Sequence, residues 1–261
     1  MIPGIISGSP ATGGASPDPL VFPSGANITH WFRASEGVFS DAGSTPAVND
    51  DPVQKWANII AATGEDADQA VLANRPIFKT GGQNGQPYMD CPDTDERFFE
   101  DLAISHNGGI TSIPVGFRTF AFVIGNWNAA ATHNPLTGGT GAAGGKFDTH
   151  LLPSAGQIRN FKPQFTFSGI ADPMIVVCSG ESASASRIVI NGTYTRISNA
   201  TNPSSSDPTS LQFLRNTWTS LSSNFFDGRM YEFIIWGSGT LLAQADMEAV
   251  SAELNEIYAI Y

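Results

Sequence analysis

The stretch that decides the fold is residues 226–261, FDGRMYEFIIWGSGTLLAQADMEAVSAELNEIYAIY. Asp227-Gly228 is a turn pair, and the run from Arg229 to Trp236 is rich in residues that favour β-strands. Successive side chains of a strand point to opposite faces. One face is uniformly apolar and is predicted to lie in a core: Tyr231, Phe233 and Ile235. The other face carries one charge and is predicted to be partly wet: Met230, Glu232, Ile234 and Trp236.

A helix is predicted to follow this strand after the break at Gly237-Ser238-Gly239. Apolar residues recur there at spacings of three and four, which is the pattern of an amphipathic helix. The apolar stripe consists of Met247, Val250, Leu254, Ile257, Tyr258 and Tyr261. A strand and one helix that end a helix-poor chain favour a β-sandwich closed off by a helix.

Further strands are predicted upstream of this stretch, separated by turns that are rich in Gly and Pro. They are residues 28–33, 75–79, 88–91, 117–124, 165–167, 174–178, 187–190, 194–196 and 211–214. Asn191-Gly192 predicts a hairpin turn, and the Gly- and Ala-rich residues 126–146 are expected to form a long surface loop. Strands at this spacing indicate an all-β sandwich, which we assign to residues 26–261.

The charge balance excludes several classes of partner. The net charge is -11 and only 14% of residues are charged, against about a quarter in ordinary domains. A chain this acidic repels phosphate backbones, and scarce lysine leaves no polybasic membrane patch, so we expect neither nucleic acid nor membrane as a partner. The start, MIPGIISGSP, lacks the basic region of a signal peptide. Cys91 and Cys178 are predicted to be buried free thiols rather than a disulfide.

Residues 1–25 are predicted to be an extended anchoring arm. Their Gly- and Pro-rich composition cannot pack alone, so an ordered arm needs a surface to lie on. That surface could be the chain's own domain, a neighbouring subunit or a larger lattice, and the spacing of apolar anchors favours a partner. The anchors are Ile2, Ile5, Ile6, Leu20 and Phe22.

Four sequence pieces, in order, resemble the laminin-G-like jelly-roll branch of the concanavalin A-like lectin/glucanase superfamily. They are Trp31-Phe32-Arg33-Ala34 with Gly37-Val38; Trp56-Ala57-Asn58 with Asn74-Arg75-Pro76; Asn84-Gly85-Gln86-Pro87-Tyr88-Met89-Asp90; and Phe226-Asp227-Gly228-Arg229-Met230-Tyr231-Glu232 with the final helix. The chain departs from the family's pattern at Cys91-Pro92. The resemblance implies a jelly-roll of two antiparallel sheets packed face to face. It implies no single function, because members include sugar binders, enzymes and virus structural parts.

Candidate chemistry is sparse, and we expect no enzyme and no obligatory cofactor. Glucanases of this superfamily place a Glu-x-Asp-x-x-Glu motif on one strand, and the sequence lacks it. Asp90, Asp93 and Asp95 cluster at a strand end and are candidate calcium ligands. Trp127 and Trp218 sit among small polar residues and are candidate platforms for sugar rings.

The function predicted from these features is that of a bacteriophage virion protein: a capsid decoration protein, head fibre or tail component anchored by its arm. The expected partners are other virion proteins or copies of the chain itself, and the expected location is the virion. The alternative is a lectin-like carbohydrate-binding module that recognises surface polysaccharide.

Overall fold

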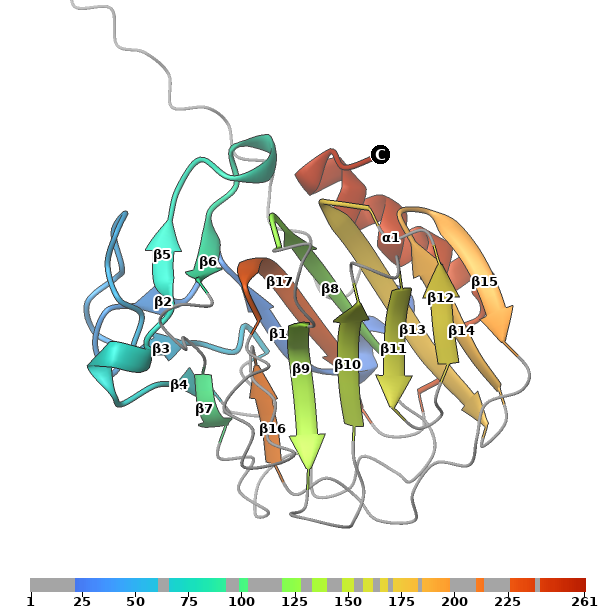
Figure 1. Cartoon of the computed structure of the whole chain (residues 1–261), viewed down its shortest axis with the longest axis horizontal. Helices are drawn as coiled ribbons and strands as arrows, with labels where there is room; N and C mark the ends of the chain where they lie inside the picture. Colours follow the sequence, from blue (N-terminus) through green and yellow to red (C-terminus); the bar gives the residue numbers. More distant parts are fainter. Residues whose placement is uncertain are drawn as a thin grey trace, which may run out of the picture.

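The computed structural model describes most of the chain. The described residues are 22–60, 66–92, 99–102, 119–127, 133–139, 147–152, 157–161, 165–168, 171–182, 185–197, 210–213, 226–237 and 240–261. Within them, two antiparallel sheets lie one in front of the other (Figure 1). The predicted all-β, two-sheet jelly-roll sandwich is therefore confirmed.

The helix-side sheet has the strand order β15-β14-β13-β8-β17-β6-β5, and β1 also pairs with β17. Its strands are β1 (Ile28–Arg33), β5 (Ile77–Lys79), β6 (Tyr88–Cys91), β8 (Thr119–Gly125), β13 (Met174–Ser182), β14 (Ala185–Ile190), β15 (Thr193–Ile197) and β17 (Gly228–Trp236). The predicted strand at 117–124 is β8, which lies between β13 and β17 in the middle of the sheet.

The opposite sheet has the order β12-β11-β10-β9-β16-β7-β4-β3-β2. Its strands are β2 (Val38–Phe39), β3 (Lys55–Trp56), β4 (Ala67–Asp68), β7 (Phe99–Leu102), β9 (His133–Gly139), β10 (Phe147–Leu152), β11 (Gln157–Phe161), β12 (Phe165–Ser168) and β16 (Ser210–Phe213). The expected surface loop at 126–146 was wrong where β9 lies. HNPLTGG has little strand propensity, and pairing with β10 and β16 overrides that weakness.

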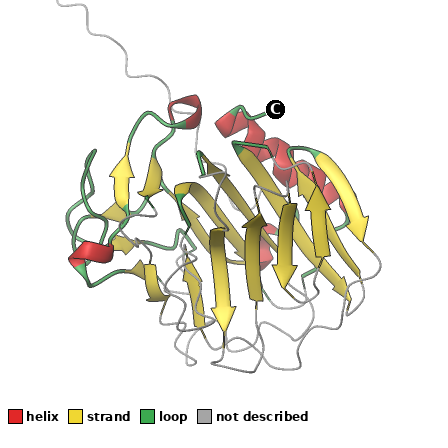
Figure 2. Cartoon of the chain, viewed as in Figure 1, coloured by secondary structure: helices red, strands yellow, loops and turns green. Residues whose placement is uncertain are grey.

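One α-helix, α1 (Gln244–Tyr258), crosses the outer face of the helix-side sheet over β13, β14 and β15 (Figure 2). The described part of the chain also contains three short 3-10 helices: η2 (Gly25–Asn27), η3 (Leu72–Asn74) and η4 (Gln83–Gly85). The predicted apolar stripe is confirmed at Met247, Val250, Leu254 and Tyr258, which are buried, whereas Tyr261 lies beyond the helix and is exposed. No helix among the described residues is long and apolar enough to cross a membrane.

Two apolar cores result from this three-layer arrangement. The core between the sheets contains Phe32, Trp56, Phe122 and Phe233. The core between the helix-side sheet and α1 contains Trp31, Trp236 and Leu254. The helix-side sheet is therefore apolar on both faces, and every residue of β8 is buried.

A bulge in β17 changes the faces that its residues were predicted to occupy. The register with β8 shifts between Met230 and Glu232, and the neighbour on the other edge changes there from β6 to β1. Tyr231 and Glu232 consequently both lie on the α1 side, whereas Phe233 lies between the sheets. The face predicted to be partly wet is in fact dry, because α1 covers it.

The hairpin turn predicted at Asn191-Gly192 is confirmed between β14 and β15. Both residues have left-handed backbones, with φ of 45° and 75°. This conformation matches the right-handed twist of the flanking strands and favours Asn-Gly over bulkier pairs.

The arm prediction needs correction at its last anchor. The Phe22 side chain is only 2% exposed, and its ring packs edge-on against Trp31 at a centroid distance of 5.2 Å. Phe22 therefore belongs to the core beneath α1 and is not free to anchor a partner. Ile2, Ile5, Ile6 and Leu20 lie outside the described residues. Cys91 and Cys178 are buried free thiols, as predicted.

His30 on β1 makes the fold sensitive to acid. Its side chain is fully buried, and burial lowers its pKa from 6.5 to about 4. Because the folded-state pKa lies below the unfolded one, the stability that this group contributes is complete above pH 6.5 and is lost as the pH falls toward 4. We expect the free energy of unfolding to drop by roughly 2–3 kcal/mol from this group between pH 7 and pH 4.5.

Urea titrations of the wild type and of His30→Gln at both pH values isolate this contribution, because the carboxyl groups are common to both proteins. The wild type should lose more stability than the variant. Equal losses would show that His30 does not titrate in this range.

Candidate functional site

A buried carboxylate joins three elements beneath the outer face of the helix-side sheet. Glu232 on β17 is 0% exposed. Its Oε1 accepts hydrogen bonds from Trp31 Nε1 at 2.5 Å and from Arg33 Nη2 at 2.7 Å. Its Oε2 accepts one from the Tyr258 hydroxyl at 2.6 Å. Both oxygens are thus bonded, to side chains from β1 and α1.

The electrostatics of this cluster are those of a permanent ion pair. The guanidinium of Arg33 lies over the Trp31 ring at 4.7 Å. Burial disfavours the charged form of Arg33, but the Glu232 carboxylate outweighs burial and raises the Arg33 pKa. Burial, together with Glu232, raises the pKa of Tyr258 well above its usual value. A saturated, inaccessible carboxylate of this kind cannot act on a substrate, and we assign it to holding α1 on the sheet.

The β5–β6 hairpin reaches across to the end of α1. Its 3-10 helix η4 donates side-chain hydrogen bonds to two helix-end carbonyls, from Asn84 Nδ2 to Ile257 O at 2.8 Å and from Gln83 Nε2 to Ala259 O at 3.1 Å. Below η4, the Tyr231 ring lies 5.5 Å from that of Tyr88 and 5.6 Å from that of Tyr258. This end of the outer face is therefore held from both sides.

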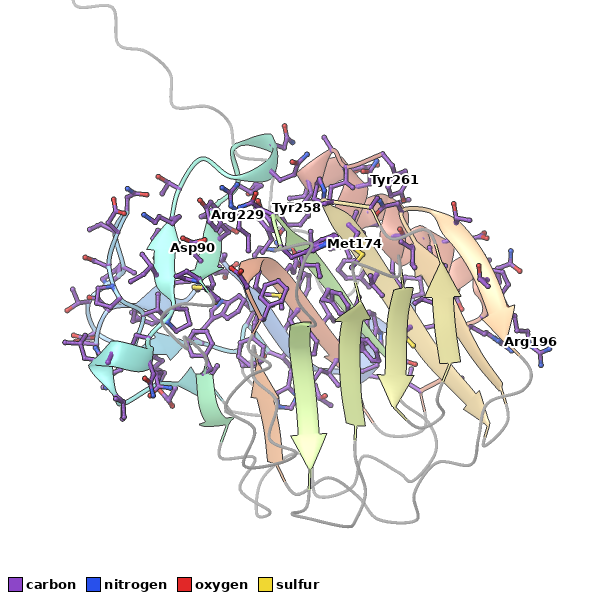
Figure 3. The ribbon with its side chains drawn as sticks, viewed as in Figure 1. Asp90, Met174, Arg196, Arg229, Tyr258 and Tyr261 are labelled. Carbon is purple, nitrogen blue, oxygen red and sulfur yellow. The ribbon has the colours of Figure 1, made fainter. Side chains whose placement is uncertain are left out.

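The polar surface at this end is the candidate functional site, which we call the outer rim. It consists of Asp90, Gly125, Asn126, Asp172 and Arg229. Arg229 on β17 is the cross-strand partner of Asp90 on β6 and of Gly125 on β8. The next residue along, Met230, lies in the core between the sheets. The alternation of strand side chains therefore sends Arg229 and its cross-strand partners to the outer face (Figure 3).

Arg229 is held in place by aromatic neighbours. Its guanidinium lies over the Tyr88 ring at 4.6 Å, and its side chain hydrogen-bonds Tyr231. Its Nε is buried and has no hydrogen-bond partner among the described residues. Burial disfavours its charge, but the bond to Tyr231 and the negative charge of Asp90 outweigh burial and raise the Arg229 pKa. The rim thus presents a charged donor with little freedom to move.

The loop ends next to Arg229 are also fixed. Asn126 has a left-handed backbone with φ of 51°, and its amide nitrogen donates to Asp172 Oδ1 at 2.5 Å. A side chain at Gly125 would bring its Cβ within 2.9 Å of Pro173 Cβ. The glycine therefore allows β8 and the Asp172-Pro173 segment to approach closely. Donors and acceptors from three separate segments meet at this rim.

The structure places the predicted site residues differently from one another. Asp90 lies in the outer rim, whereas Asp93 and Asp95 lie outside the described residues, so calcium binding stays a prediction. The neighbouring charge of Arg229 opposes a cation at Asp90. Within the described part of the chain, no three His, Cys, Asp or Glu side chains are grouped so that they could hold a metal ion.

The tryptophan prediction was wrong for Trp127. Its side chain is only 9% exposed and belongs to the core between the sheets, so it offers no platform to a sugar. The small polar residues around it in the sequence indicated exposure, but they lie in the chain next to it and not over it. Trp218 lies outside the described residues.

Sequence reasoning missed Arg229 as a site residue. The alternation of the β17 sequence could place it on one face of the strand, but not beside Asp90 and Gly125, which are far away in the chain. The available signal was the rarity of positive charge: Lys and Arg together number 13, against 24 Asp and Glu. An arginine inside an apolar strand of so acidic a chain is unusual.

Comparison with known proteins supports the fold. No protein-family model matches the sequence, and no curated protein matches it. The solved structure of Trypanosoma rangeli sialidase in complex with 2,3-difluorosialic acid is 11% identical, with a TM-score of 0.53 over 89% of this chain and 34% of the sialidase. The same sialidase in complex with sialic acid is 13% identical, with a TM-score of 0.51 over 91% of this chain and 36% of the sialidase.

A third similar structure is Ruminococcus gnavus IT-sialidase CBM40 bound to alpha2,3 sialyllactose. It is 12% identical, with a TM-score of 0.44 over 54% of this chain and 85% of that chain. This chain spans about a third of the length of the Trypanosoma rangeli sialidase. The two matches to that sialidase show a shared fold at low identity, which is the antiparallel β-sandwich described above.

Proposed function

We propose that the protein is a non-catalytic carbohydrate-binding β-sandwich whose binding surface is the outer rim. The observation that carries this proposal is Arg229, which stacks on Tyr88 and faces Asp90 across two paired strands. The rim joins a fixed donor, a carboxylate acceptor and the Asn126 amide on one rigid sheet face. Sites that recognise small polar ligands use few polar groups of this kind, held in place by their neighbours.

Carbohydrates suit this arrangement because each sugar hydroxyl can donate one hydrogen bond and accept others. The printed titles of the Trypanosoma rangeli structures describe that sialidase with sialic acid or a derivative bound. The likeness is one of fold, so it supports only that such a sandwich occurs in a sugar-binding protein. The case for this chain rests on the rim.

The proposal excludes glycoside hydrolysis by the residues that the structure describes. Hydrolysis of this type needs two carboxyl groups on either side of the scissile bond, one of which transfers a proton. The buried acid Glu232 has both oxygens bonded and no exposure. The glucanase motif of the superfamily is missing from the sequence.

The virion reading stays a prediction. Its main support was an arm that anchors on a partner, and four of the five anchors lie outside the described residues. The fifth, Phe22, packs inside its own domain. A carbohydrate-binding module fits the described surface better, and it is also compatible with a protein displayed on a larger particle.

The test is a glycan array followed by calorimetric titration of the wild type, Arg229→Gln and Arg196→Gln. Arg196 is an exposed arginine on edge strand β15, at the far side of the same sheet (Figure 3). We expect Arg229→Gln to weaken glycan binding about tenfold or more, as for a lost charge-assisted hydrogen bond, and Arg196→Gln to leave it unchanged.

Asp90→Asn provides a second variant in case Arg229→Gln lowers the melting temperature. It should also weaken binding, because the amide accepts fewer hydrogen bonds than the carboxylate. A wild type that binds no glycan on the array would overturn the proposal. Undiminished binding by both variants would also overturn it.

A further inference from the structure

We infer that the outer rim selects neutral sugars, which it binds through neighbouring hydroxyl groups, and discriminates against sugars that carry a carboxylate. This inference rests on the proposed function and specifies its ligand class. Three observations carry it: the sign of the charges around the rim, the closed side of the Arg229 guanidinium, and the spacing of Arg229 and Asp90.

The charges near the rim are predominantly negative. Asp90 and Asp172 belong to the rim, and Asp227 lies two residues before Arg229. The nearby cation Lys79, on β5, is paired with Asp50. Arg229 is therefore surrounded by carboxylates within a chain of net charge -11. A ligand carboxylate would approach three like charges to reach one guanidinium.

The geometry of Arg229 also disfavours a carboxylate. Arginine binds carboxylates most strongly through two parallel hydrogen bonds, and the side-on form of this fork uses Nε. Nε of Arg229 is buried, so a ligand cannot reach it. The bond to Tyr231 and the stack on Tyr88 hold the guanidinium in this orientation. A bound ligand can therefore use only the outward nitrogens, which suits a single hydroxyl oxygen.

The spacing suits two adjacent hydroxyls. Residues directly opposite each other on antiparallel strands have Cα atoms about 4.5–5.5 Å apart, and their side chains lie on the same face. Arg229 and Asp90 are such a pair. One sugar hydroxyl can donate to the Asp90 carboxylate while its neighbour on the ring accepts from Arg229. Asn126, which follows the third cross-strand position, offers an amide to a further hydroxyl.

The experiment uses the full chain and an array of matched oligosaccharides that differ only in a terminal sialic acid or uronic acid. We expect the neutral member of each pair to bind, and the acidic member to bind about fivefold more weakly at low salt, since each unpaired charge about 8 Å away contributes roughly a two- to threefold factor. Added salt should leave neutral binding unchanged and narrow the difference, because it screens repulsion.

Asp172→Asn provides the matched charge variant, because the asparagine oxygen can still accept from the Asn126 amide. It should shift the ratio of acidic to neutral binding two- to threefold toward the acidic sugar. Asp68→Asn, at an exposed acid on β4 of the opposite sheet, should leave the ratio unchanged.

The outcomes separate this inference from the proposed function. Preference for the acidic member, or acidic binding that salt weakens, would overturn the inference and leave carbohydrate binding intact. Binding of neither member of any pair would overturn the proposed function, and the inference with it.

Discussion

Replacing Arg33 with methionine is expected to lower the free energy of unfolding by about 3–5 kcal/mol, the usual cost of removing one partner of a buried ion pair. Arg33 and Glu232 are both buried and lie 2.7 Å apart. The variant keeps much of the side-chain volume but leaves the Glu232 carboxylate in an apolar core without a compensating charge. Trp31 and Tyr258 would still donate to it, but neither carries a charge.

Urea titration at pH 7 measures this effect, with Arg196→Met as the matched control. Arg196 is exposed, so its replacement should change stability by less than about 0.5 kcal/mol. A loss below about 1 kcal/mol for Arg33→Met would show that the pair does not hold β1, β17 and α1 together.

Truncation of Leu254 to alanine is the second large effect that we expect, at about 2–5 kcal/mol. Leu254 is fully buried in the core between α1 and the helix-side sheet. The truncation removes apolar contact and leaves a cavity between two rigid layers, which cannot close completely.

Leu241→Ala is the control, because Leu241 lies just before α1 and is exposed. The same chemical change should cost much less there. If Leu254→Ala costs under half a kcal/mol, α1 is not an integral layer of the fold, and the outer rim loses the support of its helix end.

The architecture could be predicted from the sequence where local pattern and final environment agree. The alternation in β8 and β17, the Asn191-Gly192 turn and the three-to-four spacing before Tyr258 each reflect the period of the element that forms. Where pattern and environment disagree, prediction failed. β9 contains a proline and two adjacent glycines, and its place in the sheet comes from its neighbours rather than from its own residues.

The site could not be predicted, because it depends on which strands become neighbours. Asp90 was noticed for its nearby acids, yet its cross-strand partner is Arg229, from the last strand of the chain. Glu232 was expected on a partly wet face because a charge usually seeks water. The bulge in β17 and the helix above it reverse that expectation by supplying Arg33, Trp31 and Tyr258 as partners. Such register and coverage cannot be inferred from a single strand.

The most direct test of the account is to map a bound sugar by amide chemical-shift perturbation in the isotopically labelled full chain. The probe is the neutral oligosaccharide that binds most tightly on the array. The account predicts that the largest perturbations fall on the amides of Asp90, Gly125, Asn126 and Arg229 and diminish in Arg229→Gln. Perturbations confined to β9–β12 of the opposite sheet, with the outer rim silent, would contradict it.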